Sequence, residues 1–373
     1  MQMTGVPALI RGERFLAISL LTTFAFAFYR HELLDEFPSV YRLALIFFWL
    51  FSVVLGSALA VVRHAEHLAE RLGEPYGTLI LTLCITSIEV VSITAIMLHG
   101  DNNPTLARDT LFAVTMIVLN GMVGLSLLLG GLRHREQHYN LHGANTYLGV
   151  IIPLGVMCLV LPDFVVATPK SQGLSFAQQI FIAAASLGLY VAFLFLQTSR
   201  HRAYFLPQGQ TAERHAAKAA PASARLSFHI AMLAIYMALV VYLAEKLAPP
   251  VDYVVETMGK PAALAGLAMA VLVATPEIIG AVRAAAGNNL QRSMNIFLGS
   301  VLSTIGLTIP AIIVISEITQ HPILLGLHHT DLLLFVLTLA LCMITFSSGR
   351  TNFLQGGVHL ILFIAYLFLI FEG

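Results

Sequence analysis

Long apolar runs recur along this chain, from just after Arg14 almost to its end. As a helix, a run of about 17 or more apolar residues is long enough to cross the roughly 30 Å of hydrocarbon in a bilayer. Only 11% of the residues are charged and 58% are hydrophobic, whereas soluble domains carry about 25% charged residues. The sequence therefore predicts an all-α, polytopic membrane protein whose backbone hydrogen bonds are satisfied within each helix.

Polar breaks divide these runs into helices, and the basic residues are distributed unevenly among the breaks. We expect 11 helices, at 15–29, 41–62, 76–98, 110–131, 147–168, 174–198, 227–249, 262–285, 293–315, 331–347 and 355–371. With a cytoplasmic N-terminus, 14 of the 20 basic residues face the cytoplasm, and the others are Arg30, Arg42, Arg108, Lys170, Lys246 and Lys260. Because cytoplasmic loops are enriched in Lys and Arg, this bias predicts an external C-terminus. No small-residue cleavage site follows the first helix cleanly, so we expect it to be retained rather than removed as a signal peptide.

The longest hydrophilic segment, at 199–226, is basic and rich in Ala and Gln, and it predicts a flexible cytoplasmic linker. It separates five helices at 41–198 from five helices at 227–373, after a first helix and external loop at 1–40. An odd number of helices per half gives the halves opposite orientations in the membrane. That is the arrangement of inverted-topology repeats.

The two halves align at a pair of glutamates inside apolar runs. LGEPYGTLILTLCITSIEVV, from Leu72, matches MGKPAALAGLAMAVLVATPEII, from Met258, with a slip of two residues. Each segment has Gly-x-Pro, then small and apolar residues, then a Glu followed by branched apolar residues. In the next helices, Asn120 falls opposite Thr304. The match predicts an internal duplication that places Glu89 and Glu277 at equivalent positions.

Glu89 and Glu277 are each the only charge across about one bilayer thickness. A charge at that depth costs about 3 kcal/mol, so it normally faces a cavity and marks an ion or proton route. Oxygen-bearing side chains accompany both glutamates, although a serine or threonine can instead bond its own helix. Hard oxygen donors suit Ca²⁺, Na⁺ or K⁺ better than soft metals. The candidate ligands are Glu89, Glu277, Asn120, Ser300, Thr86, Ser303 and Thr304.

Other features of the composition narrow the function further. The 20 basic and 20 acidic residues balance, which argues against nucleic acid as a partner. The three cysteines lie in apolar runs at irregular spacing and are interpreted as packing residues, and no resident cofactor is expected. The expected partners are inorganic cations, protons and the lipid bilayer. The oligomeric state is left open.

At these residues the chain resembles the calcium/cation antiporter superfamily, and most closely its bacterial calcium/proton and sodium-potassium/proton branch. The first signature of that family, Gly-Asn-x-x-Glu, ends here at Glu89, and the signature of the next helix ends at Asn120. The second signature keeps Glu277 and Gly299-Ser300. The Gly-Asn pairs are replaced by Ile85-Thr86 and Val273-Ala274, which removes amide ligands and bears on ion selectivity.

The resemblance implies one helix followed by two five-helix repeats around a central ion site, in a bacterial inner membrane. It also implies export of Ca²⁺, Na⁺ or K⁺ in exchange for H⁺, with the two glutamates binding cation and protons alternately. The alternatives are a passive cation channel, a Na⁺/Ca²⁺ exchanger and, with least support, an intramembrane enzyme. A channel pore usually needs a ring of equivalent subunits, and no nucleophile or metal motif is legible.

Three histidines carry further interpretations. His64 and His67, at the end of helix 41–62, can bind a metal or sense pH, but a solvated helix end is the simpler reading. His359 lies well inside the last helix, where a neutral, hydrogen-bonded imidazole is expected and a proton relay is the alternative.

Overall fold

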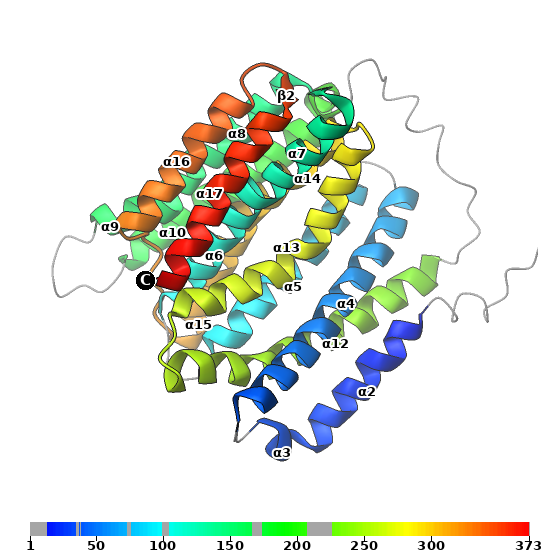
Figure 1. Cartoon of the computed structure of the whole chain (residues 1–373), viewed down its shortest axis with the longest axis vertical. Helices are drawn as coiled ribbons and strands as arrows, with labels where there is room; N and C mark the ends of the chain where they lie inside the picture. The colour runs from blue at the N-terminus through cyan, green and yellow to red at the C-terminus, as the bar shows by residue number, and fades with distance from the viewer. Residues whose placement is uncertain are drawn as a thin grey trace, which may run out of the picture.

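The computed structural model describes residues 13–34, 37, 39–72, 76–98, 104–165, 174–206 and 226–372. The predicted linker lies mostly outside the described residues, as does the Gly-x-Pro at 73–75. The described chain is almost entirely helical (Figure 1). The predicted all-α fold class is therefore confirmed.

The first half of the chain contains the helices up to the predicted linker. They are α2 (Arg14–Phe28), α3 (Arg30–Leu34), α4 (Val40–Leu72), α5 (Tyr76–Met97), α6 (Leu106–Met116), η1 (Ile117–Met122), α7 (Val123–His134), α8 (Leu141–Gly155), η2 (Val156–Val160), α9 (Leu161–Val165), α10 (Phe176–Phe195), η3 (Leu196–Arg200) and η4 (Arg202–Phe205), with the short strand β1 (Glu136–His138) after α7. Here η1, η2 and η3 are π-helical turns that continue the α-helix before them.

The described part of the second half contains fewer short pieces. It consists of α12 (Leu226–Asp252), η5 (Tyr253–Thr257), α13 (Ala262–Ala286), α14 (Leu290–Ser303), η6 (Thr304–Thr308), α15 (Ile309–Thr319), α16 (His329–Thr345), β2 (Arg350–Asn352) and α17 (Phe353–Glu372). Strands β1 and β2 pair antiparallel, with Gln137 opposite Thr351. This small ladder joins the two halves, and no sequence pattern predicted its short strands.

Each predicted helix overlaps a helical stretch of the structure. Within the described ranges, eight helices are long and apolar enough to cross a membrane, and the shorter apolar helices are Arg14–Phe28, Thr82–Ala95 and His329–Thr345. The chain is thus a multi-pass membrane protein, while the number of crossings stays a prediction.

The predicted ends are least accurate at two helices. Helix 41–62 continues as α4 to Leu72, because the polar segment after Arg63 extends the helix instead of ending it. Helix 227–249 continues past Pro249 and Pro250 into the π-helical turn η5. A proline normally breaks a helix interior, but a π turn absorbs the irregular hydrogen-bonding register.

The buried apolar side chains form two clusters. One is built mainly by α2, α4 and α12, and the other mainly by the helices from α6 to α10 and from α14 to α17. Helices α5 and α13 contribute to both: Ile88 and Met269 belong to the first cluster, and Ile93 and Ala270 to the second. The two glutamate-bearing helices therefore lie along the seam between two packed bodies.

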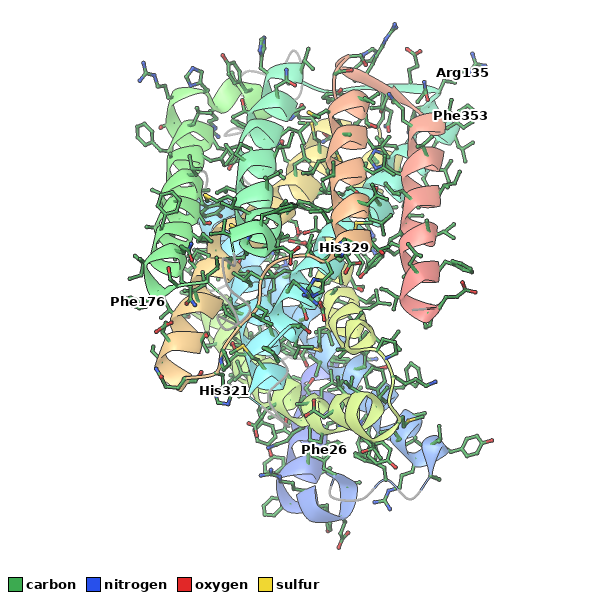
Figure 2. All side chains as sticks on the ribbon, turned by 90° about the vertical axis from the view of Figure 1, so that its left-hand side faces the viewer. Phe26, Arg135, Phe176, His321, His329 and Phe353 are labelled. Carbon is green, nitrogen blue, oxygen red and sulfur yellow. The ribbon has the colours of Figure 1, made fainter. Side chains whose placement is uncertain are left out.

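Helices α2, α4 and α12 form the smaller body, away from α16 and α17 (Figure 1). Ser19 of α2 hydrogen-bonds Ser57 of α4 at 2.9 Å, and Trp49 Nε1 donates to Thr22 Oγ1 at 3.2 Å. Figure 2 places Phe26 of α2 at one end of the molecule and Arg135 and Phe353 at the other. The first helix is thus an integral part of the smaller body.

Candidate cation site

Glu89 lies in the middle of α5 and is only 2% exposed. Its Oε2 accepts a hydrogen bond from Thr304 Oγ1 at 3.1 Å and another from Thr308 Oγ1 at 3.0 Å. The two threonines are four residues apart on the helix that runs from α14 through η6 into α15, so their hydroxyls lie on one face of it. A carboxylate from the first half of the chain is thereby bound by hydroxyls from the second half.

Glu277 lies in α13, directly after Pro276, and is partly buried. Its Oε2 accepts a hydrogen bond from the hydroxyl of Ser300. Ser300 precedes Thr304 by four residues, so successive turns of the same helix bind the two glutamates. The carboxylates are close enough for the charge of Glu89 to act on Glu277. The structure therefore brings together the two glutamates that the sequence singled out.

The helix that serves both carboxylates is irregular at the site. Pro310 has no backbone N–H, so the carbonyl of Gly306 lacks its usual partner. The chain adopts the π-helical turn η6 over Thr304–Thr308, and Pro310 then lies in the first turn of α15. Single π-helical turns inside α-helices are frequent at functional sites. This turn carries both threonines that bind Glu89.

Four buried side-chain oxygens of α5 have no hydrogen-bond partner among the described residues. They are Oε1 of Glu89, Oγ1 of Thr86 one turn earlier, and the hydroxyls of Ser92 and Thr94. Buried polar atoms are hydrogen-bonded in the great majority of cases, so an unpartnered one calls for a ligand, a water or a proton. Hydroxyl and carboxylate oxygens are the donors that alkali and alkaline-earth cations prefer.

The remaining predicted ligands point elsewhere in this structure. Ser303 donates to the carbonyl of Ser300 at 2.9 Å, which is the local bond that the sequence left open as an alternative. Asn120 is fully buried in η1, and its amide donates to Thr338 Oγ1 at 2.9 Å. The oxygen of Asn120 lies 3.3 Å from His359 Nδ1. Its amide nitrogen also donates to Met116 Sδ of α6 at 3.6 Å, so the polar atoms of Asn120 are engaged by α6, α16 and α17.

The histidine in the last helix makes the hydrogen bonds that the sequence predicts. His359 is fully buried, and its Nε2 lies 3.0 Å from Thr345 Oγ1. Its two ring nitrogens thereby bridge α16 and η1.

Thr308, in contrast, was missing from the predicted ligands, although its spacing of four residues from Thr304 was a usable signal.

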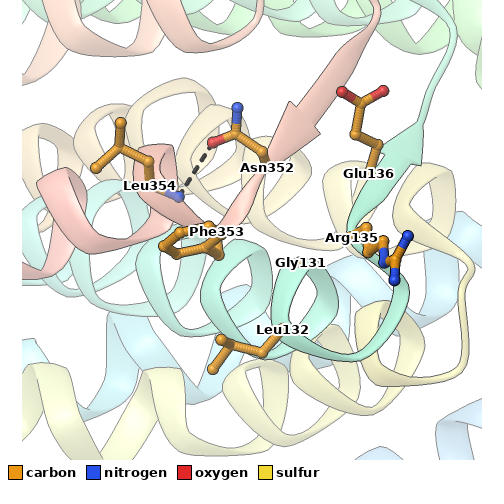
Figure 3. A pocket seen from close by; sticks show the side chains of 7 residues that line it. All are labelled: Gly131, Leu132, Arg135, Glu136, Asn352, Phe353 and Leu354. Carbon is orange, nitrogen blue, oxygen red and sulfur yellow. Dashed lines mark hydrogen bonds between the residues drawn. The ribbon is translucent and has the colours of Figure 1, made fainter.

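The hollows on the surface are separate from the glutamates. One hollow of about 550 Å³ lies beside the β1–β2 ladder and is lined by Gly131, Leu132, Arg135, Glu136, Asn352, Phe353 and Leu354 (Figure 3). In it Asn352 Oδ1 accepts a hydrogen bond from the backbone N–H of Leu354 at 3.0 Å. No predicted ligand lines this hollow, so the candidate site is the buried one at the seam.

Known proteins resemble the chain over most of its length. It is 43% identical over 318 residues to the putative ionic transporter y4hA of Sinorhizobium fredii, covering 85% of this chain and 86% of that protein. It is 40% identical over 322 residues to the sodium-potassium/proton antiporter ChaA of Escherichia coli K12, with the same coverages. The solved structure of native YfkE superposes with a TM-score of 0.72 at 19% identity, over 96% of this chain and 100% of that one. At such low identity this likeness concerns the fold.

A solved structure of the H⁺/Ca²⁺ exchanger CAX has the same fold, with a TM-score of 0.67 at 13% identity, over 97% of this chain and 89% of that one. The model of the sodium/calcium exchanger protein family matches residues 42–199 and 228–372. These stretches include both glutamates and every hydroxyl bonded to them. The chain belongs to the sodium/calcium exchanger protein family.

Proposed function

We propose that this protein is a secondary active antiporter that exports Na⁺, K⁺ or Ca²⁺ from the cytoplasm in exchange for H⁺. The proposal rests on one observation: a single helix hydrogen-bonds both Glu89 and Glu277. Its donors are Ser300, Thr304 and Thr308. The similarity to known transporters supports the proposal, since one protein that is 40% identical is a sodium-potassium/proton antiporter. No resident cofactor takes part, since the cations are the transported substrates.

The exchange follows from the cost of burying charge. Two neighbouring buried carboxylates are unfavourable together unless a cation or protons neutralise them. A cation bound by Glu89 and Glu277 therefore competes with protons for the same oxygens. Cation and protons cross in opposite directions because the two carboxylates are never occupied by both in full.

We propose that Glu89, Glu277, Thr86, Ser300 and Thr304 contact the cation, with Thr308 orienting Glu89. The free Oε1 of Glu89 and the free hydroxyl of Thr86 support the α5 side of this set. The other two candidates, Asn120 and Ser303, join it only after a change of rotamer, because their polar atoms are engaged elsewhere.

Alternating access uses the seam between the two hydrophobic clusters. A relative shift of the α2, α4 and α12 body exposes α5 and α13 first to one side of the membrane and then to the other. Inverted repeats at 41–198 and 227–373, with 11 crossings and a cytoplasmic N-terminus, fit this motion. Support comes from the π-helical turns η1 and η6, which contain the aligned residues Asn120 and Thr304. The membrane is the bacterial inner membrane.

The choice of cation follows from the ligand chemistry. Both Gly-Asn pairs of the superfamily signatures are replaced, so hydroxyls take the place of amides next to Glu89. Fewer amide oxygens favour a monovalent cation over Ca²⁺, which takes 6–8 oxygen ligands. We therefore place Na⁺ and K⁺ before Ca²⁺ as substrates.

The test is dequenching of acridine orange in energised everted membrane vesicles. Na⁺, K⁺ and Ca²⁺ are added separately between pH 7 and 9 to vesicles with wild-type protein, Glu89→Gln or Glu277→Gln. We expect dequenching with the wild type and none with either variant, because an amide keeps the shape of the carboxyl group but carries no negative charge and takes up no proton between pH 7 and 9. Proton-coupled transport that survives both substitutions would falsify the proposal. Calcium uptake that depends on Na⁺ instead would indicate Na⁺/Ca²⁺ exchange.

A further inference from the structure

A cluster of buried titratable side chains lies at one end of the α2, α4 and α12 body, in the C-terminal part of α4. His64 of α4 faces His229 of α12, with 2.9 Å between their Nδ1 atoms. His64 is 1% exposed and His229 is 6% exposed. The interpretation of His64 as part of a solvated helix end is therefore wrong, because α4 continues beyond it and α12 covers it.

Glu13, which immediately precedes α2, connects the third helix to this pair. Its Oε2 accepts a hydrogen bond from Tyr236 Oη of α12 at 3.0 Å and pairs with Arg63 of α4. Its other oxygen lies 3.5 Å from His64 Nε2. The side chain of Glu13 is 9% exposed, so one nearly buried carboxylate gathers donors from two helices.

The distance between the histidines limits how many protons the pair can hold. Two Nδ1 atoms at 2.9 Å need one proton between them, because one nitrogen must donate and the other accept. Either imidazole can be the donor, so the geometry suits a neutral pair or a pair with one added proton. When both rings are fully protonated, two N–H groups point at each other and two positive charges repel.

The neighbouring charges reinforce this limit. The charged and titratable groups around the pair are Glu13 before α2, Arg63 and His67 on α4, and Tyr236 on α12. The His67 ring lies 4.8 Å from that of His229, so a charged His67 adds to the repulsion. Among the described side chains next to the pair, Glu13 supplies the negative charge, and Arg63 already pairs with it. A metal ion does not fit, because His64 presents different nitrogens to His229 and Glu13.

We propose that His64, His229 and Glu13 form a proton-sensitive latch that holds α2, α4 and α12 together and opens when both imidazoles are charged. Imidazole is the side chain whose charge changes most readily between pH 5 and 8, so the pair can respond to acidification of the cytoplasm. Acidification separates the ends of α4 and α12, which changes the body that packs against α5 and α13. If the protein is the antiporter proposed above, acidification of the cytoplasm slows the exchange and so limits further proton entry.

The structural arm of the test measures a distance, not transport. Spin labels are placed at Glu66→Cys on α4 and Ser227→Cys on α12, both exposed, in the full-length protein in lipid nanodiscs. The native cysteines stay, since Cys84, Cys158 and Cys342 are buried. Between pH 7.5 and 5.5, we expect the label distance to lengthen and its distribution to broaden. His64→Gln and His229→Gln should each abolish this change, whereas His142→Gln, outside the cluster, should preserve it.

The functional arm uses the vesicle assay with the pH varied on the cytoplasmic face at constant ΔpH. We expect the wild-type rate to fall up to about tenfold for each pH unit below the transition, because the latch opens when a singly protonated pair takes up its second proton. The transport rate of His229→Gln should fall less than about twofold over the same pH range.

The distance measurement is repeated with Glu277→Gln, which disables the proposed transport site. A pH-dependent separation that persists there supports the latch even if the antiport proposal fails. The latch is overturned if the label distance does not depend on pH, or if it still changes with pH in both His64→Gln and His229→Gln. Size-exclusion profiles show whether a variant is misfolded. If either His64→Gln or His229→Gln misfolds, the pH dependence of the other variant tests the latch.

Discussion

At the scale of single residues, the hydroxyl of Thr308 acts directly on the carboxylate of Glu89. It donates at 3.0 Å to the same oxygen that Thr304 reaches, and both residues are almost fully buried. A hydrogen bond to a charged group is worth about 1.5–3 kcal/mol. The bond stabilises the charged carboxylate, which is the form that binds a cation.

Replacing Thr308 with valine keeps the shape of the side chain and removes this donor. Thr308→Val should raise the KM for the transported cation about tenfold or more, with the largest effect at the lower end of the pH range, because protons then compete better for Glu89. Initial dequenching rates against cation concentration, at pH 7 and pH 9, measure the effect. Thr308→Ser is the matched control and should stay within about twofold of the wild type. Equal KM values for the valine and serine variants would show that the hydroxyl has no part in binding.

At the scale of helices, small residues decide how closely α13 approaches its neighbours. Gly266, Ala270, Ala274, Gly280 and Ala281 lie on the same helix face as Glu277, and small residues of this kind let a neighbouring helix approach closely. A Cβ atom on Gly266 would lie 2.9 Å from the backbone carbon of Asp109 and from the backbone nitrogen of Thr110. Backbone atoms of α6 cannot give way, so the close approach requires glycine at this position.

Gly266→Val should therefore push α13 away from α6 and destabilise the fold by about 1–3 kcal/mol. Gly280→Ala on the same helix is the control, because its new Cβ would meet only the Ile296 side chain, at 3.6 Å. Thermal unfolding of the purified protein, followed by size-exclusion chromatography, compares the two. A melting temperature for Gly266→Val as high as that of Gly280→Ala would contradict the packing argument.

At the scale of the whole molecule, the orientation and the number of crossings are the main predictions that stay open. The basic residues place the N-terminus and the linker in the cytoplasm and the C-terminus outside. An odd number of crossings is required for this arrangement. The described residues contain eight long apolar helices and three shorter ones, which is compatible with it.

Fusions to alkaline phosphatase and to a green fluorescent protein distinguish the alternatives. A fusion after Gly373 should give active phosphatase and no fluorescence, since phosphatase folds only outside the cytoplasm and the fluorescent protein only within it. A fusion within the linker, after Leu206, should give the opposite result and serves as the internal control. Matching results at the two positions would mean that an even number of helices separates them, and the inverted repeats would then be wrong.

The sequence by itself determined the helices and the two carboxylates, because both follow from the cost of exposing polar groups to lipid. Apolar runs must be helical in a bilayer, and a lone charge within one must have a function. The alignment of the two halves also singled out Thr304 before any contact was known. The ends of α4 and α12 were missed because polar residues and prolines do not always end a helix.

Only the tertiary structure decided which oxygens face the glutamates and which groups pair across helices. Helical periodicity gives the face of a residue but not the rotation of that helix against its neighbours. Asn120 therefore bonds Thr338 and lies beside His359, whereas Thr308 reaches Glu89. His64 likewise meets His229, a partner 165 residues away. Contacts over such separations depend on how the helices pack, which no local pattern encodes.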